Sequence, residues 1–212
     1  MKTIPKGLFI TFEGPDKAGK STQIKLLEQK LRCQGYEVLM TREPGGTLLG
    51  EELRRLVMQF RAEGIAPGAE LLLFGASRAQ LVHNFLLPQL TAGKIILCDR
   101  FADSTTAYQG GARHLDAGFI AALHQFSLQG RWPDLTFLLD LSVEESFRRL
   151  QTARTGKHDR FEEEDRKFHH QVREAFLQIA RDNPQRVRVL DASQQVETIA
   201  EKIYQEVARV LV

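Results

Sequence analysis

The sequence is poor in cysteine and has no long apolar run. Its 212 residues include two cysteines, Cys33 and Cys98, and neither belongs to a metal-binding spacing. We therefore expect reduced thiols rather than a disulfide framework or a zinc site. No apolar stretch is long enough to span a bilayer, and residues 1–6 have no apolar signal region. These absences predict a cytoplasmic protein with no membrane-bound part.

A large net charge and linker-like sequence are also lacking. The formal net charge is +2, which argues against a general nucleic-acid-binding surface. The sequence has no internal repeat, low-complexity segment or Pro/Gly/Ser-rich linker. Because nothing divides the chain, we expect a single domain over residues 1–212.

Apolar segments of strand length alternate with segments of helical periodicity. The predicted strands are 8–12, 37–41, 94–98, 136–141 and 187–190. The predicted helices are 21–31, 48–61, 68–91, 116–129, 143–153, 161–182 and 195–210. Near-continuous apolar strands separated by helices indicate a three-layer α/β fold, a five-stranded parallel sheet flanked by helices on both faces. Ligands of such sheets bind at the carboxyl ends of the strands.

A phosphate-binding motif follows the first predicted strand. Residues 14–21, GPDKAGKS, match the P-loop pattern G-x-x-x-x-G-K-[ST] between a strand and a helix, as that motif requires. The glycines let successive N–H groups point at a polyphosphate at the positive end of the next helix. Lys20 is expected to reach the β- and γ-phosphates, and Ser21 to ligate Mg²⁺. The motif predicts nucleotide binding on a P-loop NTPase fold.

Asp99 and Arg100 follow the third predicted strand. A P-loop NTPase places a carboxylate there to hold Mg²⁺, directly or through water, whereas an Asp after a strand also commonly caps a turn. The P-loop in the same chain favours the metal role for Asp99. Arg100 is expected at the cleft mouth, where a second anion binds; a surface ion pair is the alternative.

Glu70, Phe74 and Arg78 are spaced four residues apart and share one face of a predicted helix. A stacking ring beside a guanidinium suits a planar, carbonyl-bearing base. A Phe among leucines is also typical of a helix core, with Arg78 merely exposed. Both interpretations stay open at this point.

Residues 148–170 are dense in charge, and a solvated helix face alone explains such a run. In a phosphoryl-transfer enzyme, however, a mobile basic segment stabilises the transferred group and excludes water. Because residues 155–157 break the helical pattern, we predict a short mobile lid at about 150–162. His169 and His170 are expected on the surface.

Taken in chain order, these motifs resemble those of bacterial thymidylate kinases. The resemblance covers nearly the whole chain. It rests on FEGPDKAGKSTQ at 12–23, REPGGT at 42–47, Phe74 with Ser77-Arg78, DRF at 99–101, S-T-x-x-Y-Q-G at 104–110, PDLT at 133–136 and DRFE at 159–162.

The resemblance implies transfer of a phosphoryl group from MgATP to thymidine monophosphate (dTMP), giving dTDP and ADP for DNA precursor synthesis. It also implies a homodimer, for which the exposed faces of helices 48–61 and 68–91 are candidate surfaces. Ser21 and Asp99 would hold the metal. The implied ATP-binding residues are Gly14, Pro15, Asp16, Lys17, Ala18, Gly19, Lys20, Ser21 and Thr22.

For the acceptor base, the resemblance implies a pocket of four residues. Phe74 would stack on thymine and Arg78 would bond its exocyclic oxygen. Thr105 would lie near the N3 edge, and Tyr108 would press on the deoxyribose where a 2′-hydroxyl would otherwise be.

Asp16 would hold the sugar 3′-hydroxyl and the metal environment, and Arg100 would bind the acceptor phosphate. Residues 191–193 resemble an adenine-side contact. The other implied substrate contacts are Glu43, Pro44 and Gln109.

The P-loop departs from the family pattern at one position. The family supplies a catalytic arginine either from the P-loop or from the lid, but here Lys17 occupies the P-loop position while the lid keeps Arg154. Because lysine lacks the planar fork of arginine, we expect Arg154 to be the transition-state arginine and Lys17 to be auxiliary. The predicted catalytic residues are Lys20, Asp16, Arg100 and Arg154.

The alternative is another P-loop nucleotide kinase or a deoxynucleoside kinase. Glu43 follows the second strand, where a nucleoside kinase has its base for the 5′-hydroxyl, but Arg100 offers a receptor for an acceptor phosphate. A GTP-dependent switch is disfavoured because the chain has no Asn-Lys-x-Asp motif. A binding-only relative is disfavoured because Lys20, Ser21, Asp99 and Arg100 are all present.

Overall fold

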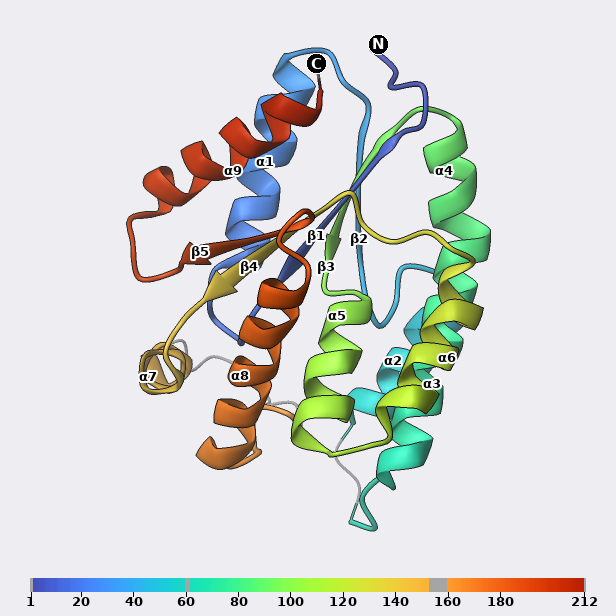
Figure 1. Cartoon of the computed structure of the whole chain (residues 1–212), viewed down its shortest axis with the longest axis vertical. Coiled ribbons are helices and arrows are strands. Elements are labelled where there is room, and N and C mark those ends of the chain that lie inside the picture. The colour runs from blue at the N-terminus through green and yellow to red at the C-terminus, as the bar shows by residue number, and fades with distance from the viewer. Residues whose placement is uncertain (1, 60–61, 153–159, 212) are drawn as a thin grey trace.

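The computed structural model describes residues 2–59, 62–152 and 160–211. Its centre is a five-stranded sheet with the strand order β2-β3-β1-β4-β5, and every neighbouring pair is parallel (Figure 1). The strands are β1 (Leu8–Glu13), β2 (Val38–Arg42), β3 (Ile95–Asp99), β4 (Leu135–Asp140) and β5 (Val187–Asp191). The predicted α/β fold and its five strands are confirmed.

Helices cover both faces of the sheet. On one face lie α1 (Lys20–Cys33) and α9 (Val196–Val210), which pack against each other (Figure 1). The opposite face is covered by α3 (Pro67–Leu81), η1 (Val82–Leu86), α4 (Leu87–Thr91), α5 (Ala102–Thr105), η2 (Thr106–Ala112), α6 (Ala117–Leu128) and α8 (Arg166–Asp182). Of the two remaining helices, α2 (Leu48–Met58) packs on α3, and α7 (Val143–Thr152) follows β4.

The burial of the central strand, β1, explains why its residues form a nearly continuous apolar run. Ile10 and Phe12 of β1 belong to the core beneath α1 and α9, whereas Phe9 belongs to the core on the other face. All three side chains are fully buried. A strand that is buried on both faces has no solvent-facing side, and its residues are therefore nearly all apolar. The P-loop follows the carboxyl end of this buried strand.

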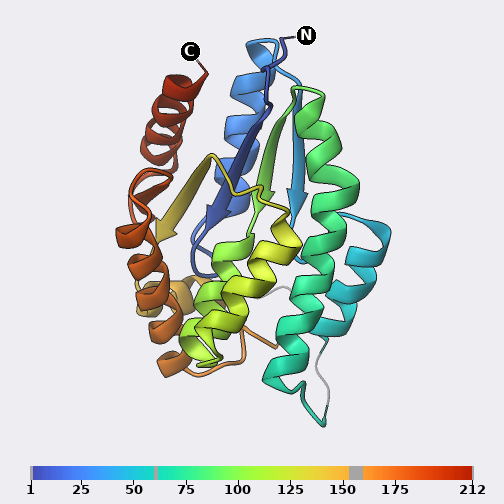
Figure 2. The same cartoon turned by 45° about the vertical axis from the view of Figure 1, so that its right-hand side comes forward.

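The predicted helix 68–91 is one uninterrupted run from α3 through the π-helical η1 into α4, drawn from teal to green in Figure 2. The same view shows α2 and α6 on either side of this run. An added Cβ at Gly75 of α3 would lie 2.8 Å from Cδ1 of Leu123 in α6, so these two helices approach closely. This contact places the Phe74–Arg78 face of α3 against the rest of the site.

Two sequence-based expectations need correction, and one helical stretch was not predicted. The stretch Ala102–Ala112, for which no element was predicted, is helical in α5 and the π-helical η2. Helix α8 begins at Arg166 rather than 161, because the Asp165 side chain accepts a hydrogen bond from Phe168 N and caps the helix there. His169 is buried, with its ring edge-on to Phe147, whereas His170 is exposed as expected.

The predicted lid, about 150–162, falls mainly on residues 153–159, which lie outside the described residues. In the described part of the chain, no helix combines the length and apolar character needed to cross a bilayer. Both cysteines are free thiols, with Cys98 buried in β3 and Cys33 exposed on α1.

Candidate active site

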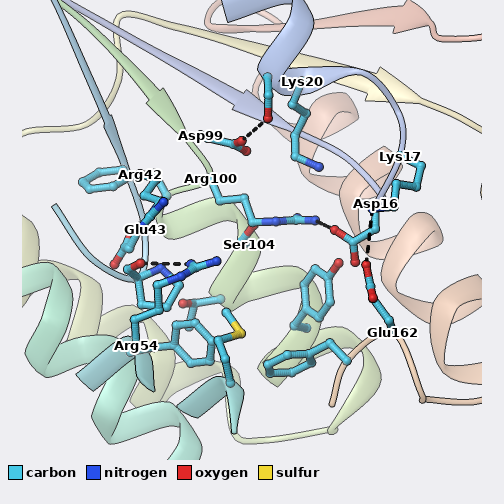
Figure 3. Close-up of a pocket in the computed structure, with 18 of the residues that line it drawn as sticks. Asp16, Lys17, Lys20, Arg42, Glu43, Arg54, Asp99, Arg100, Ser104 and Glu162 are labelled. Carbon is cyan, nitrogen blue, oxygen red and sulfur yellow. Dashed lines mark hydrogen bonds and ion pairs between the residues drawn. The ribbon is translucent and has the colours of Figure 1, made fainter. Parts of the chain in front are cut away.

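A cavity of about 500 Å³ opens at the carboxyl ends of β1, β2 and β3 (Figure 3). The predicted site residues that line it are Asp16, Lys17, Gly19, Lys20, Ser21, Thr22, Glu43, Pro44, Phe74, Arg78, Asp99, Arg100, Thr105, Tyr108 and Gln109. Of the remaining P-loop residues, Gly14 and Pro15 contact Lys20, and Ala18 packs in the core. Arg154 lies outside the described residues. Segments far apart in the sequence therefore meet in one cavity.

The P-loop wraps around its own lysine. Lys20 Nζ donates to the carbonyl oxygens of Pro15 at 2.9 Å and Gly14 at 3.2 Å. Burial, with further repulsion from Arg100, lowers the pKa of Lys20 to about 8. Gly14 has φ 128°, and a Cβ there would lie 2.3 Å from the Leu139 carbonyl oxygen, so no other residue fits. The loop is thus held tightly against β4 with its ammonium group in the cavity.

Ser21 and Asp99 meet at the start of α1. Ser21 Oγ donates to Asp99 Oδ2 over 3.1 Å. A hydroxyl and a carboxylate are hard oxygen ligands of the kind Mg²⁺ prefers, and this pair lies beside the P-loop where a bound polyphosphate would complete the coordination. The residues present fit the magnesium site expected from the sequence, and their metal role stays a prediction.

Asp16 and Arg100 form an ion pair at the centre of the cavity, labelled in Figure 3. Arg100 Nη2 lies 2.7 Å from Asp16 Oδ1, and the guanidinium carbon lies 5.4 Å from the centre of the Tyr108 ring. Burial by itself would raise the pKa of Asp16, but the charges of Arg100 and Lys20 lower it to about 2. Arg100 therefore belongs to the cavity, and its alternative as a surface ion pair is wrong.

Arg78 is buried and is held by three different elements. Its Nε lies 2.8 Å from Glu43 Oε1, and its Nη2 donates to Thr105 Oγ1 at 2.6 Å. Its Nη1 lies 3.3 Å from His124 Nδ1. The side chain is 1% exposed, so the interpretation of Arg78 as a surface residue is wrong. Its guanidinium lines the cavity in a fixed orientation.

The carboxylate of Glu43 is held in its contact with Arg78. Burial raises its pKa to about 7, although the charge and hydrogen bond of Arg78 oppose the shift. With its carboxylate held against Arg78, Glu43 is a support for the cavity wall rather than a freely placed base.

Aromatic rings form one wall of the cavity, and the ring of Tyr108 lies beside Arg100. Phe161, near the end of the predicted lid, is buried with its ring centre 6.1 Å from that of Phe74 and 5.7 Å from that of Tyr108. Phe74 lines the cavity and also packs against the core, so its packing role is confirmed and its contact with a base stays a prediction. The cavity wall has the shape and apolar character to accept a planar ring.

Gln109 is oriented from behind by Glu70. Its Nε2 donates to Glu70 Oε1 at 2.6 Å, and the fully buried Glu70 also pairs with Arg160 at 2.6 Å. Arg160 Nε in turn donates to the Val57 carbonyl at 2.8 Å. Glu70 thus ties the end of the predicted lid to α2, α3 and η2. This explains why it shares a helix face with Phe74 and Arg78.

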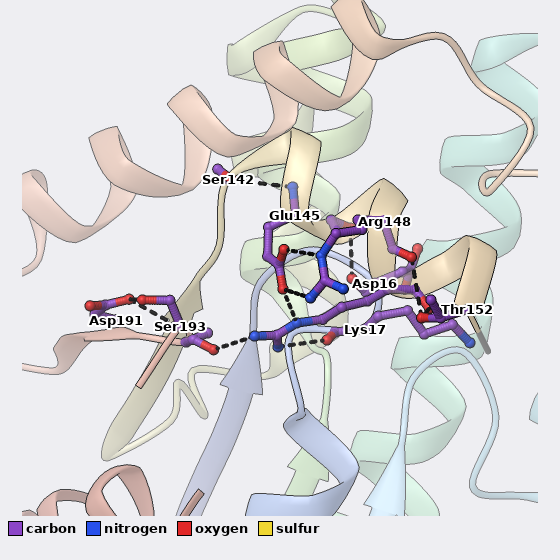
Figure 4. A network of polar contacts seen from close by, with 11 residues as sticks. Asp16, Lys17, Ser142, Glu145, Arg148, Thr152, Asp191 and Ser193 are labelled. Carbon is purple, nitrogen blue, oxygen red and sulfur yellow. Dashed lines mark hydrogen bonds and ion pairs between the residues drawn. The ribbon is translucent and has the colours of Figure 1, made fainter. Parts of the chain in front are cut away.

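Sequence reasoning missed several residues of the site. Arg54 lines the cavity and donates to the Pro44 carbonyl at 3.1 Å. Arg149 bridges the Lys17 and Ala192 carbonyls and pairs with Glu145, in the network shown in Figure 4. The i,i+4 spacing of Glu145 and Arg149 was the available signal for this pair. For Arg54 the sequence offers no comparable signal.

Comparison with known proteins supports one family. The family model described as thymidylate kinase matches residues 12–203. The thymidylate kinase of Pelobacter propionicus is 44% identical over 205 residues, 95% of this chain and 94% of that protein. Those of Thermomicrobium roseum and Pseudomonas putida strain F1 are 45% and 48% identical, covering 96% and 93% of this chain and 95% and 93% of theirs.

A solved structure agrees with these relatives. The crystal structure of thymidylate kinase from Ehrlichia chaffeensis matches with a TM-score of 0.77 and 34% identity, covering 96% of this chain and 99% of that one. The order of motifs, the sheet and the cavity fit the same conclusion. The chain belongs to the thymidylate kinase family.

Proposed function

We propose that the cavity binds dTMP with its base between Phe74 and Arg78 and its phosphate at Arg100, facing ATP on the P-loop. The family's reaction is the ATP-dependent phosphorylation of dTMP to dTDP. One observation carries the assignment of residues to this reaction: the P-loop lysine, the Asp16–Arg100 pair and the Phe74–Arg78 face all line one cavity. Donor and acceptor therefore meet without rearrangement of the sheet.

Arg78 supports recognition of a carbonyl-bearing base. A guanidinium has five N–H donors, and the contacts to Glu43, His124 and Thr105 engage three nitrogen atoms with one donor each. Within the described residues, one N–H on each terminal nitrogen is left for the cavity. A carbonyl oxygen at position 4 of thymine or uracil accepts such a bond, whereas the amino group of cytosine does not. We expect this site to discriminate against dCMP.

The chemistry asks little of an acid or base. The attacking phosphate oxygen is already anionic at neutral pH, so catalysis consists of positioning and charge stabilisation. Arg100 orients the acceptor phosphate while Asp16 fixes its guanidinium, and Lys20 stabilises the transferred group. Mg²⁺, held by Ser21 and Asp99, would neutralise charge on the ATP phosphates.

Arg154 keeps its proposed role as the transition-state arginine. Nζ of Lys17, the rival group, lies 3.7 Å from Glu162 Oε1, so part of its charge is directed to the end of the predicted lid. The fork of an arginine suits the spread charge of the transferred phosphoryl group better than a point charge does.

The decisive experiment is ADP release from MgATP with a panel of acceptors: dTMP, dUMP, UMP, dCMP, dGMP and thymidine. We expect strong turnover with dTMP, weaker turnover with dUMP and little with UMP or dCMP. Efficient use of dCMP would contradict the role of Arg78, and efficient use of UMP would contradict that of Tyr108. Turnover with thymidine but not dTMP would mean that Glu43 acts as a base in a nucleoside kinase.

We also propose that the enzyme is a homodimer. Large apolar side chains are exposed on α2, α3 and α6, which pack side by side (Figure 2). They are Leu48, Leu49, Leu56, Leu72, Phe119 and Phe126. Exposed apolar surface of this kind commonly marks a protein–protein contact. The cytoplasmic location, the single domain and the lid expected from the sequence stay predictions.

A further inference from the structure

His124 lies behind Arg78 and belongs to none of the sequence motifs. It belongs to α6 and is 5% exposed. Its Nδ1 lies 3.3 Å from Arg78 Nη1, and its Nε2 lies 3.0 Å from Thr106 Oγ1. The close approach of α3 and α6 at Gly75 and Leu123 brings the two side chains together.

The two contacts of the imidazole require the same tautomer. The guanidinium of Arg78 offers only donors, so Nδ1 must present its lone pair. The Thr106 hydroxyl also lies 3.4 Å from the Ala102 carbonyl, to which it donates, so its oxygen accepts from Nε2–H of His124. Both ends thus place the proton on Nε2.

The surroundings keep His124 neutral and in place. Burial, with repulsion from Arg78 and Arg186, lowers the pKa of His124 to about 3. The Trp132 ring meets the imidazole edge-on at 5.6 Å between centres, and Arg186 lies 5.0 Å from the centre of the Trp132 ring. The ring therefore cannot turn without breaking these contacts.

We propose that His124 is a positioning residue for the acceptor base: its Nδ1 lone pair fixes the Arg78 guanidinium so that the free N–H groups face the cavity. This inference rests on the proposed contact between Arg78 and the base carbonyl. Glu43 contacts Nε of the guanidinium and Thr105 contacts Nη2. His124 contacts the remaining nitrogen, Nη1. His124 then contributes to the KM for dTMP and to the rejection of dCMP without touching either.

Three substitutions separate this role from simple packing. In His124→Asn the side-chain oxygen lies as many bonds from Cβ as Nδ1 does, so an acceptor for Arg78 is kept. His124→Gln reaches toward Thr106 instead and lacks an acceptor at the Nδ1 position. His124→Phe keeps the ring volume and removes both polar atoms. If His124 only filled space, the Phe variant would have the KM for dTMP nearest to that of the wild type. If it has the proposed role, the Asn variant would.

We expect His124→Phe and His124→Gln to raise the KM for dTMP by roughly tenfold, because a buried donor of Arg78 loses its partner. The KM for MgATP should change less than about twofold in all three variants. His124→Asn should stay within about threefold of the wild-type KM for dTMP. The ratio of kcat/KM for dTMP over dCMP should fall in the Phe and Gln variants.

Unchanged dTMP kinetics in the Phe and Gln variants, or an Asn variant as impaired as the Phe variant, would overturn the proposal. Arg78→Ala is the parallel arm. If it leaves the KM for dTMP unchanged, the proposed function of Arg78 fails; if it raises that KM while the His124 variants do not, only the present inference fails.

A measurement on the wild-type enzyme covers the case in which a variant fails to fold. The ¹⁵N spectrum of histidine-labelled protein at pH 7 should show His124 as a neutral imidazole with its proton on Nε2. A proton on Nδ1, or a charged ring, would overturn the proposal because neither state accepts a bond from Arg78.

Discussion

At the scale of single residues, the site depends on buried or half-buried carboxylates that hold specific partners. Asp16 holds Arg100, Glu43 holds Arg78 and Glu70 holds Gln109, at distances of 2.6 to 2.8 Å. In the fully buried Glu43–Arg78 pair, removing one member leaves the other buried and unpaired, which costs more than the pair itself contributes to stability. Each acidic residue thus preserves the geometry of a neighbour that faces substrate.

The identity of the transition-state arginine is a residue-scale prediction. Arg154→Ala should lower kcat by about a thousandfold and change the KM for dTMP much less, since the contact strengthens in the transition state. Lys17→Ala, the matched control, should lower kcat only a few-fold. Steady-state kinetics with both substrates varied measure this, and the opposite ranking of the two variants would move the role to Lys17.

Glu13 is a buried acid for which the reaction has no use. It ends β1 with no exposed surface, and its carboxyl accepts hydrogen bonds from Phe101 N at 2.7 Å and Ser104 Oγ at 2.6 Å. Burial, followed by the nearby charge of Asp103, raises its pKa from 4.5 to about 8. The folded state thus keeps a proton that the unfolded chain loses near pH 4.5. The contribution of Glu13 to the free energy of unfolding must therefore fall as pH rises between these two values.

Glu13→Gln should therefore remove the part of the stability loss at rising pH that comes from Glu13. The free energy of unfolding of the variant, relative to wild type, should rise between pH 5 and pH 8 by about 1 kcal/mol per pH unit and level off above pH 8. Urea unfolding at several pH values measures it. The exposed Glu174→Gln on α8 is the control and should show no such trend. A pH-independent difference for Glu13→Gln would show that the carboxyl is ionised in the folded protein.

At the scale of secondary structure, η2 and α8 act as a pair. Tyr108 and Gln109 both belong to η2, which packs along α8. A Cβ added at Gly111 would lie 2.5 Å from the Cβ of Ala175 in α8. The small residue at this crossing lets the two helices approach closely enough to place Tyr108 in the cavity.

Gly111→Ala should push η2 away from α8. We expect a loss of roughly 1–3 kcal/mol in stability from overpacking, together with a raised KM for dTMP. Thermal unfolding and steady-state kinetics measure the two effects. In the Gly111→Ala background, Ala175→Gly should restore both by removing the clashing methyl group. A double variant as impaired as the single one would rule out this contact as the cause.

At the scale of the whole molecule, the proposed dimer can be tested on the α2, α3 and α6 surface. Sedimentation equilibrium at micromolar concentration should give twice the mass of the chain. Leu72→Glu combined with Phe126→Glu should give a monomer, because two charges would enter an apolar contact. Val189→Glu, at an exposed apolar position on β5, is the control and should leave the dimer intact. A monomeric wild type would contradict the proposal.

The success of sequence reasoning varied with how local each feature is. The P-loop and Ser21 were predicted because a strand followed by a glycine-rich turn sets their geometry within a short segment. Asp99 was predicted because it stands at the end of an apolar strand in a chain that has a P-loop. The helix over 102–112 was missed because Gly110 and Gly111 disfavour a helix locally. The helix forms because close packing against α8 requires a residue without a side chain at Gly111.

The sequence by itself determined the parallel sheet, the strand ends that carry the site and the family, because apolar periodicity and motif spacing are local properties of the chain. Only the tertiary structure decided how Arg78 is held. Its partners Glu43, Thr105 and His124 come from a loop and two helices, and nothing in their spacing along the chain records that they meet. Long-range packing brings them together, since a buried guanidinium must find partners wherever the fold supplies them.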